Sequence, residues 1–197
     1  MSGVVYRVPP MSVSAVRGTA EGLRSALSLD NEPLFPVMTV LEKVLDNRLE
    51  LIRLEIWPDT DLQGVEGLTF RDDEGVDRIV LPQSVYHSAW SDDGRARFTA
   101  AHEIGHWALH SKCALARAHA STLKPFENSE WQANLFAAEI LMPVRFIYAD
   151  DTAQDLCTRF RVSLQAAELR LRNLAKWGIA LKRKPPPFGG GSKFVTG

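Results

Sequence analysis

Apolar residues follow first a helical and then a strand-like spacing near the start of the chain. Five of them fall at i, i+3, i+4, i+7 and i+8, which predicts an amphipathic helix that begins near Pro36; they are Val37, Val40, Leu41, Val44 and Leu45. Residues 52–56 then alternate between apolar and charged side chains, as a half-buried strand does. A helix followed by a strand is therefore predicted.

A hairpin is predicted next. Short apolar runs at residues 68–70 and 78–81 flank the turn-forming sequence RDDEG at residues 71–75. Charged residues and glycine between two apolar runs are typical of a hairpin turn. These strands are predicted to form a small antiparallel sheet.

Two longer helices follow the hairpin. Residues 95–110 contain no proline, and the residues from Ser91 to Asp93 can cap the start of a helix there. A second helix is predicted from Asn128 until Pro143 ends it. The stretch between the two helices has no clear periodicity and can form one wall of a substrate cleft. The predicted fold class is α+β, with the sheet packed on the first of these helices.

The remaining segments complete four predicted divisions. Residues 1–30 mix Pro, Ser and Gly with a short helical patch, which predicts a loose N-terminal arm. Residues 31–150 form the main domain. The pattern of residues 151–181 predicts two short helices that resemble a helix-turn-helix. Residues 182–197 are rich in Lys, Pro and Gly, which predicts a disordered tail.

Composition excludes some classes of protein. The 197 residues are 45% hydrophobic, enough for a real core, and a net charge of −1 gives no global field toward nucleic acid or membrane. Neither a signal peptide nor an apolar stretch long enough to span a membrane is recognised. Cys113 and Cys157 are too few for a disulfide scaffold, so a cytoplasmic protein with free thiols is expected.

The first long helix carries the sequence His-Glu-x-x-His. Residues four apart lie on one face of a helix, so His102 and His106 can direct two imidazole nitrogens at one zinc ion. Glu103 is placed to act as general base on a zinc-bound water. Gly105 lowers helix propensity but allows another element to approach closely. The alternative is a surface helix with incidental histidines.

A catalytic zinc usually needs a third protein ligand. The metzincin pattern would require Gly and His where this chain has Leu109 and Lys112, so that class is excluded. Glu130 in the second helix is favoured, with Asn134 one turn later as a hydrogen-bonding residue. Two rival glutamates remain: Glu139 would face away from Glu130 on the same helix, and Glu127 precedes the cap. Glu130 can also be read as a first-turn acid that complements the helix dipole.

Two sequence blocks carry a resemblance to a known family. RFTAAHEIGHWALH at residues 97–110 and EWQANLFAAEILMP at residues 130–143 occur in the order and form typical of the ImmA/IrrE metallopeptidases, which are gluzincin-like zinc proteins. The similarity covers roughly residues 36–177. It implies a zinc metallopeptidase domain at residues 31–150 that holds one Zn²⁺ per chain, with His102, His106 and Glu130 as metal ligands and Glu103 as catalytic base.

The resemblance also implies a regulatory endopeptidase, because members cut a helix-turn-helix repressor or an antitoxin-like DNA-binding protein. The residue that stabilises the oxyanion stays open among Tyr86, His110, His119 and Tyr148. His110 is interpreted as a structural residue near the site.

Two other functions remain as alternatives. The first is a transcriptional or stress regulator with a sensory or vestigial zinc site, whose basic C-terminal helices bind DNA. We favour instead a structural role for these helices. The second is a toxin or partner-binding module with structural zinc, which would require a fourth ligand such as Cys113 or His110.

Overall fold

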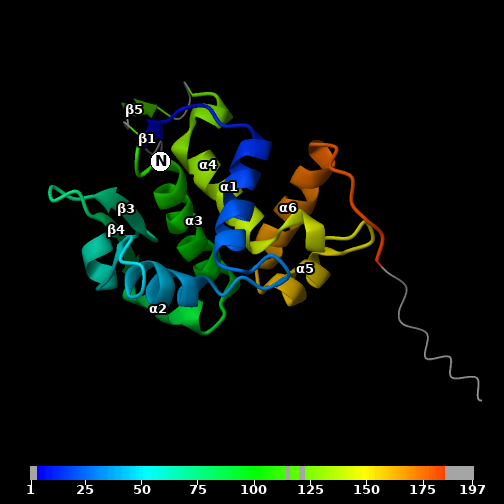
Figure 1. Ribbon diagram of the computed structural model, residues 1–197, viewed down its shortest axis with the longest axis horizontal. Coiled ribbons are helices and arrows are strands. Elements are labelled where there is room, and N and C mark those ends of the chain that lie inside the picture. The colour runs from blue at the N-terminus through cyan, green and yellow to red at the C-terminus, as the bar shows by residue number, and fades with distance from the viewer. Residues whose placement is uncertain (1–3, 114–115, 120–122, 185–197) are drawn as a thin grey trace, which may run out of the picture.

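The computed structural model describes residues 4–113, 116–119 and 123–184. Its fold class is α+β, as predicted: a three-stranded sheet and a two-stranded sheet lie against a group of helices (Figure 1). Within the described residues, none of the helices has the length and apolar character needed to cross a membrane. The shorter elements are η1 (Thr39–Asp46), η2 (Asp59–Leu62), α2 (Gln83–Trp90), η4 (Pro125–Glu127) and η5 (Val144–Phe146).

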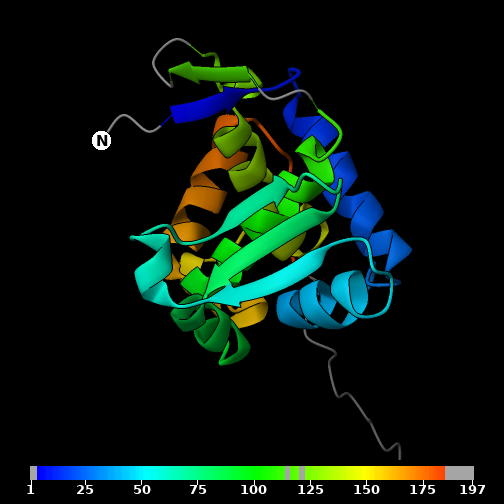
Figure 2. The same ribbon diagram turned by 90° about the vertical axis from the view of Figure 1, so that its left-hand side faces the viewer.

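The three-stranded sheet has the order β2 (Arg53–Trp57), β4 (Asp77–Pro82) and β3 (Leu68–Arg71). The predicted hairpin is confirmed, because β3 and β4 pair antiparallel. The prediction of a purely antiparallel sheet is wrong, because β2 and β4 pair in parallel. Strand β3 carries the chain back across the sheet, so β4 runs in the same direction as β2. Figure 2 shows this mixed sheet lying across the central helices.

The two central helices are α3 (Gly94–His110) and α4 (Ser129–Leu141), which pack against each other. The cap of α4 is Asn128, as predicted, whereas the cap of α3 is Asp93 and not Ser91, which ends α2. Asp93 accepts hydrogen bonds from the backbone N–H groups of the first turn of α3, and Asn128 does the same for α4. Both caps fix where the helices begin and therefore where their polar residues lie.

At Gly105, α4 lies so close to α3 that a side chain would have little room. A Cβ atom at residue 105 would lie 3.0 Å from Cδ1 of Phe136 and 3.1 Å from the backbone oxygen of Ala133. The predicted reason for a glycine in this helix is thereby confirmed.

This contact predicts opposite effects for two glycine-to-alanine substitutions in helices. Gly22→Ala in α1 (Val13–Ala26) meets no atom within 4 Å, so it should stabilise the protein by roughly 0.5–1 kcal/mol through helix propensity. Gly105→Ala should instead destabilise by about 1 kcal/mol, because the backbone of α4 must move. Urea unfolding of both variants measures the difference, and equal stabilisation would contradict the close approach.

The prediction of a loose N-terminal arm is wrong for residues 4–30. β1 (Val4–Arg7) pairs antiparallel with β5 (Ala116–His119), and α1 packs on α4. The buried face of α1 consists of Val16, Ala20 and Arg24, and the Arg24 guanidinium donates to the Ile140 carbonyl at 2.7 Å. A face made of a valine, an alanine and an arginine gives only a weak apolar signal in the sequence.

The two predicted C-terminal helices are α5 (Ala153–Phe160) and α6 (Leu164–Lys176). Between them Arg161 has a left-handed backbone with φ of 51°, and Ser163 caps α6. Their apolar residues, such as Phe160 and Leu174, belong to the same core cluster as α3 and α4. Residues 182–184 reach the main domain through Lys182, which pairs with Tyr148, whereas the rest of the predicted tail lies outside the described residues.

Candidate metal centre

Three donor groups converge where α3 faces α4. The Nε2 atoms of His102 and His106 lie 2.9 Å apart. In the Glu130 carboxylate from α4, Oε2 lies 3.3 Å from Nε2 of His102 and Oε1 lies 3.3 Å from Nε2 of His106. The structure therefore brings together the three residues that the sequence singles out as metal ligands.

These donors fit a zinc ion. Two imidazole nitrogens and one carboxylate oxygen form a set typical of catalytic zinc, which keeps a fourth position open. Ligand atoms at about 2.0–2.1 Å from the ion in a tetrahedron would lie about 3.3 Å apart. The two imidazole nitrogens are 2.9 Å apart, and each lies 3.3 Å from one of the two Glu130 oxygens, so the spacing is close to that value. The side chain of Glu130 is 45% exposed, against 16% for His102 and 17% for His106, so the cluster opens toward the carboxylate side.

Hydrogen bonds orient the first imidazole. The Oδ1 atom of Asn134 lies 3.2 Å from Nδ1 of His102, so Nδ1–H can donate and leave the Nε2 lone pair free for a metal. The predicted role of Asn134 as a hydrogen-bonding residue one turn after Glu130 is thereby confirmed. The contact links α4 to the ligand on α3.

A longer chain of hydrogen bonds orients the second imidazole. His106 Nδ1 lies 3.3 Å from His110 Nδ1, and His110 Nε2 lies 3.0 Å from Oε1 of Gln132. The Gln132 amide nitrogen donates to the carbonyls of Pro9 and Phe126, so its oxygen must face His110. His110 then donates from Nε2 and accepts from His106 at Nδ1. Burial lowers the pKa of His110 to about 4, which keeps it in this neutral form near neutral pH.

The rival ligands lie elsewhere. Glu139 is buried on the other side of α4, where Arg17 and Arg170 bind it. In the part of the chain that the structure describes, the group of side chains that could hold one ion consists of His102, His106 and Glu130. Neither Glu127 nor Cys113 is in this cluster, and both ring nitrogens of His110 have other partners.

The general-base candidate, Glu103, lies beside the cluster and is only 4% exposed. The Thr69 hydroxyl of β3 donates a hydrogen bond to Oε2 of Glu103 at 2.7 Å, which connects the sheet to α3. A Cβ atom at residue 67 would lie 2.7 Å from Oε1, so Gly67 allows the chain to pass beside the carboxylate. Burial raises the pKa of Glu103 above its ordinary value, against the opposite effect of His102 and His106.

Glu130 responds differently to the same surroundings. Burial alone would raise its pKa, but the hydrogen bonds to His102 and His106 outweigh burial and hold the pKa well below its usual range. The two carboxyl groups therefore differ: Glu130 is held as an anion suited to bind a cation, and Glu103 is the better proton acceptor.

A cleft of about 430 Å³ opens over the cluster. Its walls include Thr69 and Phe70 of β3, Ser129 of α4 and Tyr6 of β1. The Tyr6 backbone N–H lies 3.4 Å from the Ser129 hydroxyl, which attaches β1 beside Glu130. Sequence reasoning missed Tyr6, because no spacing relates it to the zinc motif.

The tyrosines considered from the sequence as oxyanion stabilisers lie away from the cleft. The Tyr86 phenol donates to Glu42 at 2.8 Å, and the Tyr148 ring lies under the guanidinium of Arg159. The side chain of His119 lies outside the described residues. Of the three candidates whose side chains the structure describes, His110 is the one that lines the cleft.

The fold and this site define a metallopeptidase-type protein with a His-Glu-x-x-His helix and a glutamate from the next helix. Residues 59–172 match the family described as the IrrE N-terminal-like domain of the M78 peptidases. This match spans more than half of the chain, which therefore belongs to that family. The matched region runs from η2 into α6 and includes all the residues of the metal cluster. A comparison with curated proteins found no match.

The Asn134 contact predicts a change in metal affinity. Asn134→Ala should weaken zinc binding by roughly 10–100-fold, because the imidazole of His102 loses the partner that fixes its orientation and tautomer. Competition with a chromophoric chelator measures the affinity. Asn173→Ala on α6 is the control and should leave it unchanged. Equal affinities of the wild type and Asn134→Ala would contradict the orienting role.

Proposed function

We propose that this protein is a zinc-dependent endopeptidase that regulates another protein by cleaving it. The observation that carries the proposal is the meeting of His102, His106 and Glu130 beside the buried carboxylate of Glu103, within a cleft. Zinc held by the three ligands would supply Lewis acidity to the reacting carbonyl and to water.

Glu103 performs the proton transfers in this proposal. Its carboxylate takes a proton from the attacking water and passes it to the leaving amine. Thr69 holds the carboxylate in one orientation through its hydroxyl. Tyr6, which lines the same cleft, is the phenol available to donate to the developing oxyanion.

The edge strand β3 offers a way to hold a polypeptide substrate. It is the last strand of the three-stranded sheet, and Leu68 and Phe70 on it are 37% and 40% exposed. An extended polypeptide can add to such an edge through backbone hydrogen bonds. Thr69 on the same strand contacts Glu103, so a polypeptide bound there would pass close to the catalytic base.

The substrate that we propose is a helix-turn-helix repressor or an antitoxin-like DNA-binding protein. This part of the proposal is supported by the resemblance of the two sequence blocks to the ImmA/IrrE peptidases. We place the reaction in the cytoplasm, where the two free cysteines would stay reduced.

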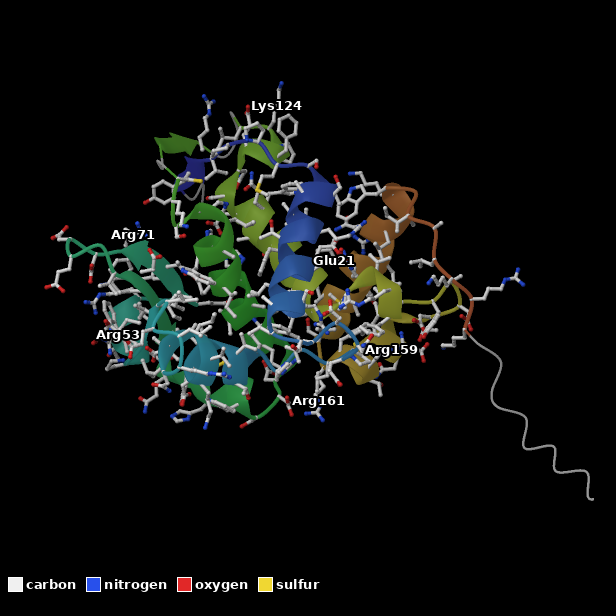
Figure 3. All side chains as sticks on the ribbon, in the orientation of Figure 1. Glu21, Arg53, Arg71, Lys124, Arg159 and Arg161 are labelled. Atoms are coloured by element: carbon white, nitrogen blue, oxygen red, sulfur yellow. The ribbon has the colours of Figure 1, made fainter. Side chains whose placement is uncertain are left out.

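The alternative of a DNA-binding regulator has less support from the fold. In a helix-turn-helix, the first residues of the recognition helix contact the bases. Here the backbone just before α6 packs against the start of α3: a Cβ atom at residue 94 would lie 2.4 Å from the backbone nitrogen of Ser163, which caps α6. Figure 3 shows Arg159 and Arg161 on the α5 side of the molecule, far from Arg71 at the cleft. The packing favours the structural role for these helices.

The proposed activity can be tested in the native host by mapping new protein N-termini. Cells that express the wild type should contain neo-N-termini in a DNA-binding protein, and cells that express His102→Ala should not. The purified wild type must then cut that protein at the same bond, in a reaction that a chelator stops and added zinc restores. Identical N-termini in both strains would contradict the peptidase function, whereas salt-dependent duplex binding in both proteins would favour the regulator.

A further inference from the structure

A second groove lies toward the N-terminal end of α3, beyond the metal cluster. Its volume is about 680 Å³, larger than that of the cleft over the metal ligands. Helices α3, α4 and α6 form most of its walls, and its apolar lining includes Phe98, Trp131, Leu135, Leu169 and Trp177. We call it the α6 groove. The proposed chemistry does not use it.

The α6 groove adjoins the metal cluster directly. Asn134 lines the groove, and its side-chain oxygen contacts the imidazole of His102. Phe98 lies one helical turn before His102. The α6 groove, the metal cluster and the cleft therefore lie in this order along the line where α3 packs against α4.

The edge strand also joins the two spaces. Glu66, just before β3, lines the α6 groove, and the strand that follows it lines the cleft from Leu68 to Arg71. A polypeptide that is extended along β3 and over the metal cluster would thus have one of its ends directed toward the groove.

The wall contributed by α6 contains an exposed leucine beside the polar residues Gln165 and Asn173. Leu169 is 49% exposed although it lines the groove, so an occupant could cover it. The guanidinium of Arg170 is already bound to Glu139 and to the carbonyl of Met142, and it presents no free charge to an occupant. The rim is polar, with Glu66, Arg95 and Asn173.

We propose that the α6 groove binds a large apolar side chain of the polypeptide substrate, at a fixed position relative to the cleaved bond. This inference rests on the proposed function and adds the sequence preference of the enzyme to it. An apolar pocket of this size favours such a side chain, because binding removes apolar surface of both partners from water. The C-terminal helix α6 is then the element that selects the substrate.

Two leucines of α6 give a matched pair for the test. Leu169 lines the groove, whereas Leu164 is 51% exposed on the same helix and is not among the groove residues. The probe is a pool of synthetic peptides that represents all residue types evenly at each position. The zinc-loaded wild type, Leu169→Glu and Leu164→Glu are incubated with this pool, and the cut bonds are read by mass spectrometry.

The wild type should prefer Leu, Met or Phe at one position beside the cut bond. Leu169→Glu should reduce that preference by roughly tenfold or more, and a basic residue at the same position should become more favourable. Leu164→Glu should retain the wild-type profile. Equal profiles for the two variants would overturn the proposal, provided that zinc content and thermal unfolding show both variants to be folded.

A binding experiment separates the groove from the proposed activity. Zinc-loaded Glu103→Gln protein is immobilised, and the retained peptides from the same pool are sequenced. Enrichment of large apolar residues that Leu169→Glu removes and Leu164→Glu preserves would support the groove even if the wild type cuts nothing, in which case only the peptidase function fails. Each leucine substitution is tested here in the Glu103→Gln protein. Absence of the enrichment, or its loss with both leucine substitutions, would overturn the proposal that the groove binds an apolar side chain.

Discussion

Glu103→Gln is expected to lower the rate of peptide cleavage by roughly a thousandfold or more while about one zinc ion per chain is retained. The carboxylate of Glu103 is outside the group of metal ligands, so the substitution removes a proton acceptor and no ligand. Glutamine has the same size and can still accept the hydrogen bond that Thr69 donates. The rate is measured on a peptide that the wild type cuts, and metal content by elemental analysis.

Glu130→Gln and Glu127→Gln serve as comparison variants. Glu130→Gln replaces a metal-binding carboxylate by an amide and should lose both zinc and activity. Glu127 lies in η4 and is not in the metal cluster, so Glu127→Gln should change neither quantity. If Glu103→Gln loses its zinc, or if Glu130→Gln keeps it, the assignment of base and ligand is wrong.

Arg170→Met is expected to lower the free energy of unfolding by roughly 3–5 kcal/mol. The Arg170 and Glu139 side chains are each 1% exposed, and two hydrogen bonds of 2.8 and 2.6 Å join them. Without Arg170, the buried carboxylate keeps only Arg17, and the Met142 carbonyl at the end of α4 loses its donor. Urea unfolding measures the loss. Arg172→Met, an exposed position on the same helix, should change stability little.

The double variant Glu139→Leu/Arg170→Met tests the cause. If the loss comes from an uncompensated buried charge, removal of both charged groups should restore part of the stability that Arg170→Met loses. A double variant less stable than Arg170→Met would show that packing dominates instead.

Glu139 should also contribute to the acid sensitivity of the fold. Burial opposes its ionisation, but the hydrogen bonds from Arg170 and Arg17 outweigh burial and hold its pKa below the ordinary value. A lowered pKa stabilises the folded state above the unfolded-state pKa of about 4.3, and this contribution is lost as the pH falls through the folded-state pKa. The stability difference between the wild type and Glu139→Gln, measured in urea, should therefore be largest near neutral pH and shrink below about pH 4.

The candidate metal-binding residues could be predicted from the sequence because their spacing on each helix is local, although the meeting of the two helices is a tertiary contact. The spacing of His102 and His106 fixes their common face once the helix forms, and a helix forms there because Asp93 caps it and no proline interrupts it. Glu130 and Asn134 are likewise one turn apart on a helix that Asn128 caps. The hairpin β3–β4 and the two C-terminal helices were also predictable from short-range patterns.

Only the tertiary structure decided which distant segments complete the site. Tyr6 reaches the cleft because β1 pairs with β5, and Thr69 reaches Glu103 because the sheet lies on α3; no sequence spacing records either contact. The parallel pairing of β2 with β4 depends on the path of β3 across the sheet. The buried face of α1 is recognised only when Arg24 and Arg17 meet their partners on α4. Local patterns fix helices and the residues they align, whereas contacts between remote segments depend on how the whole core packs.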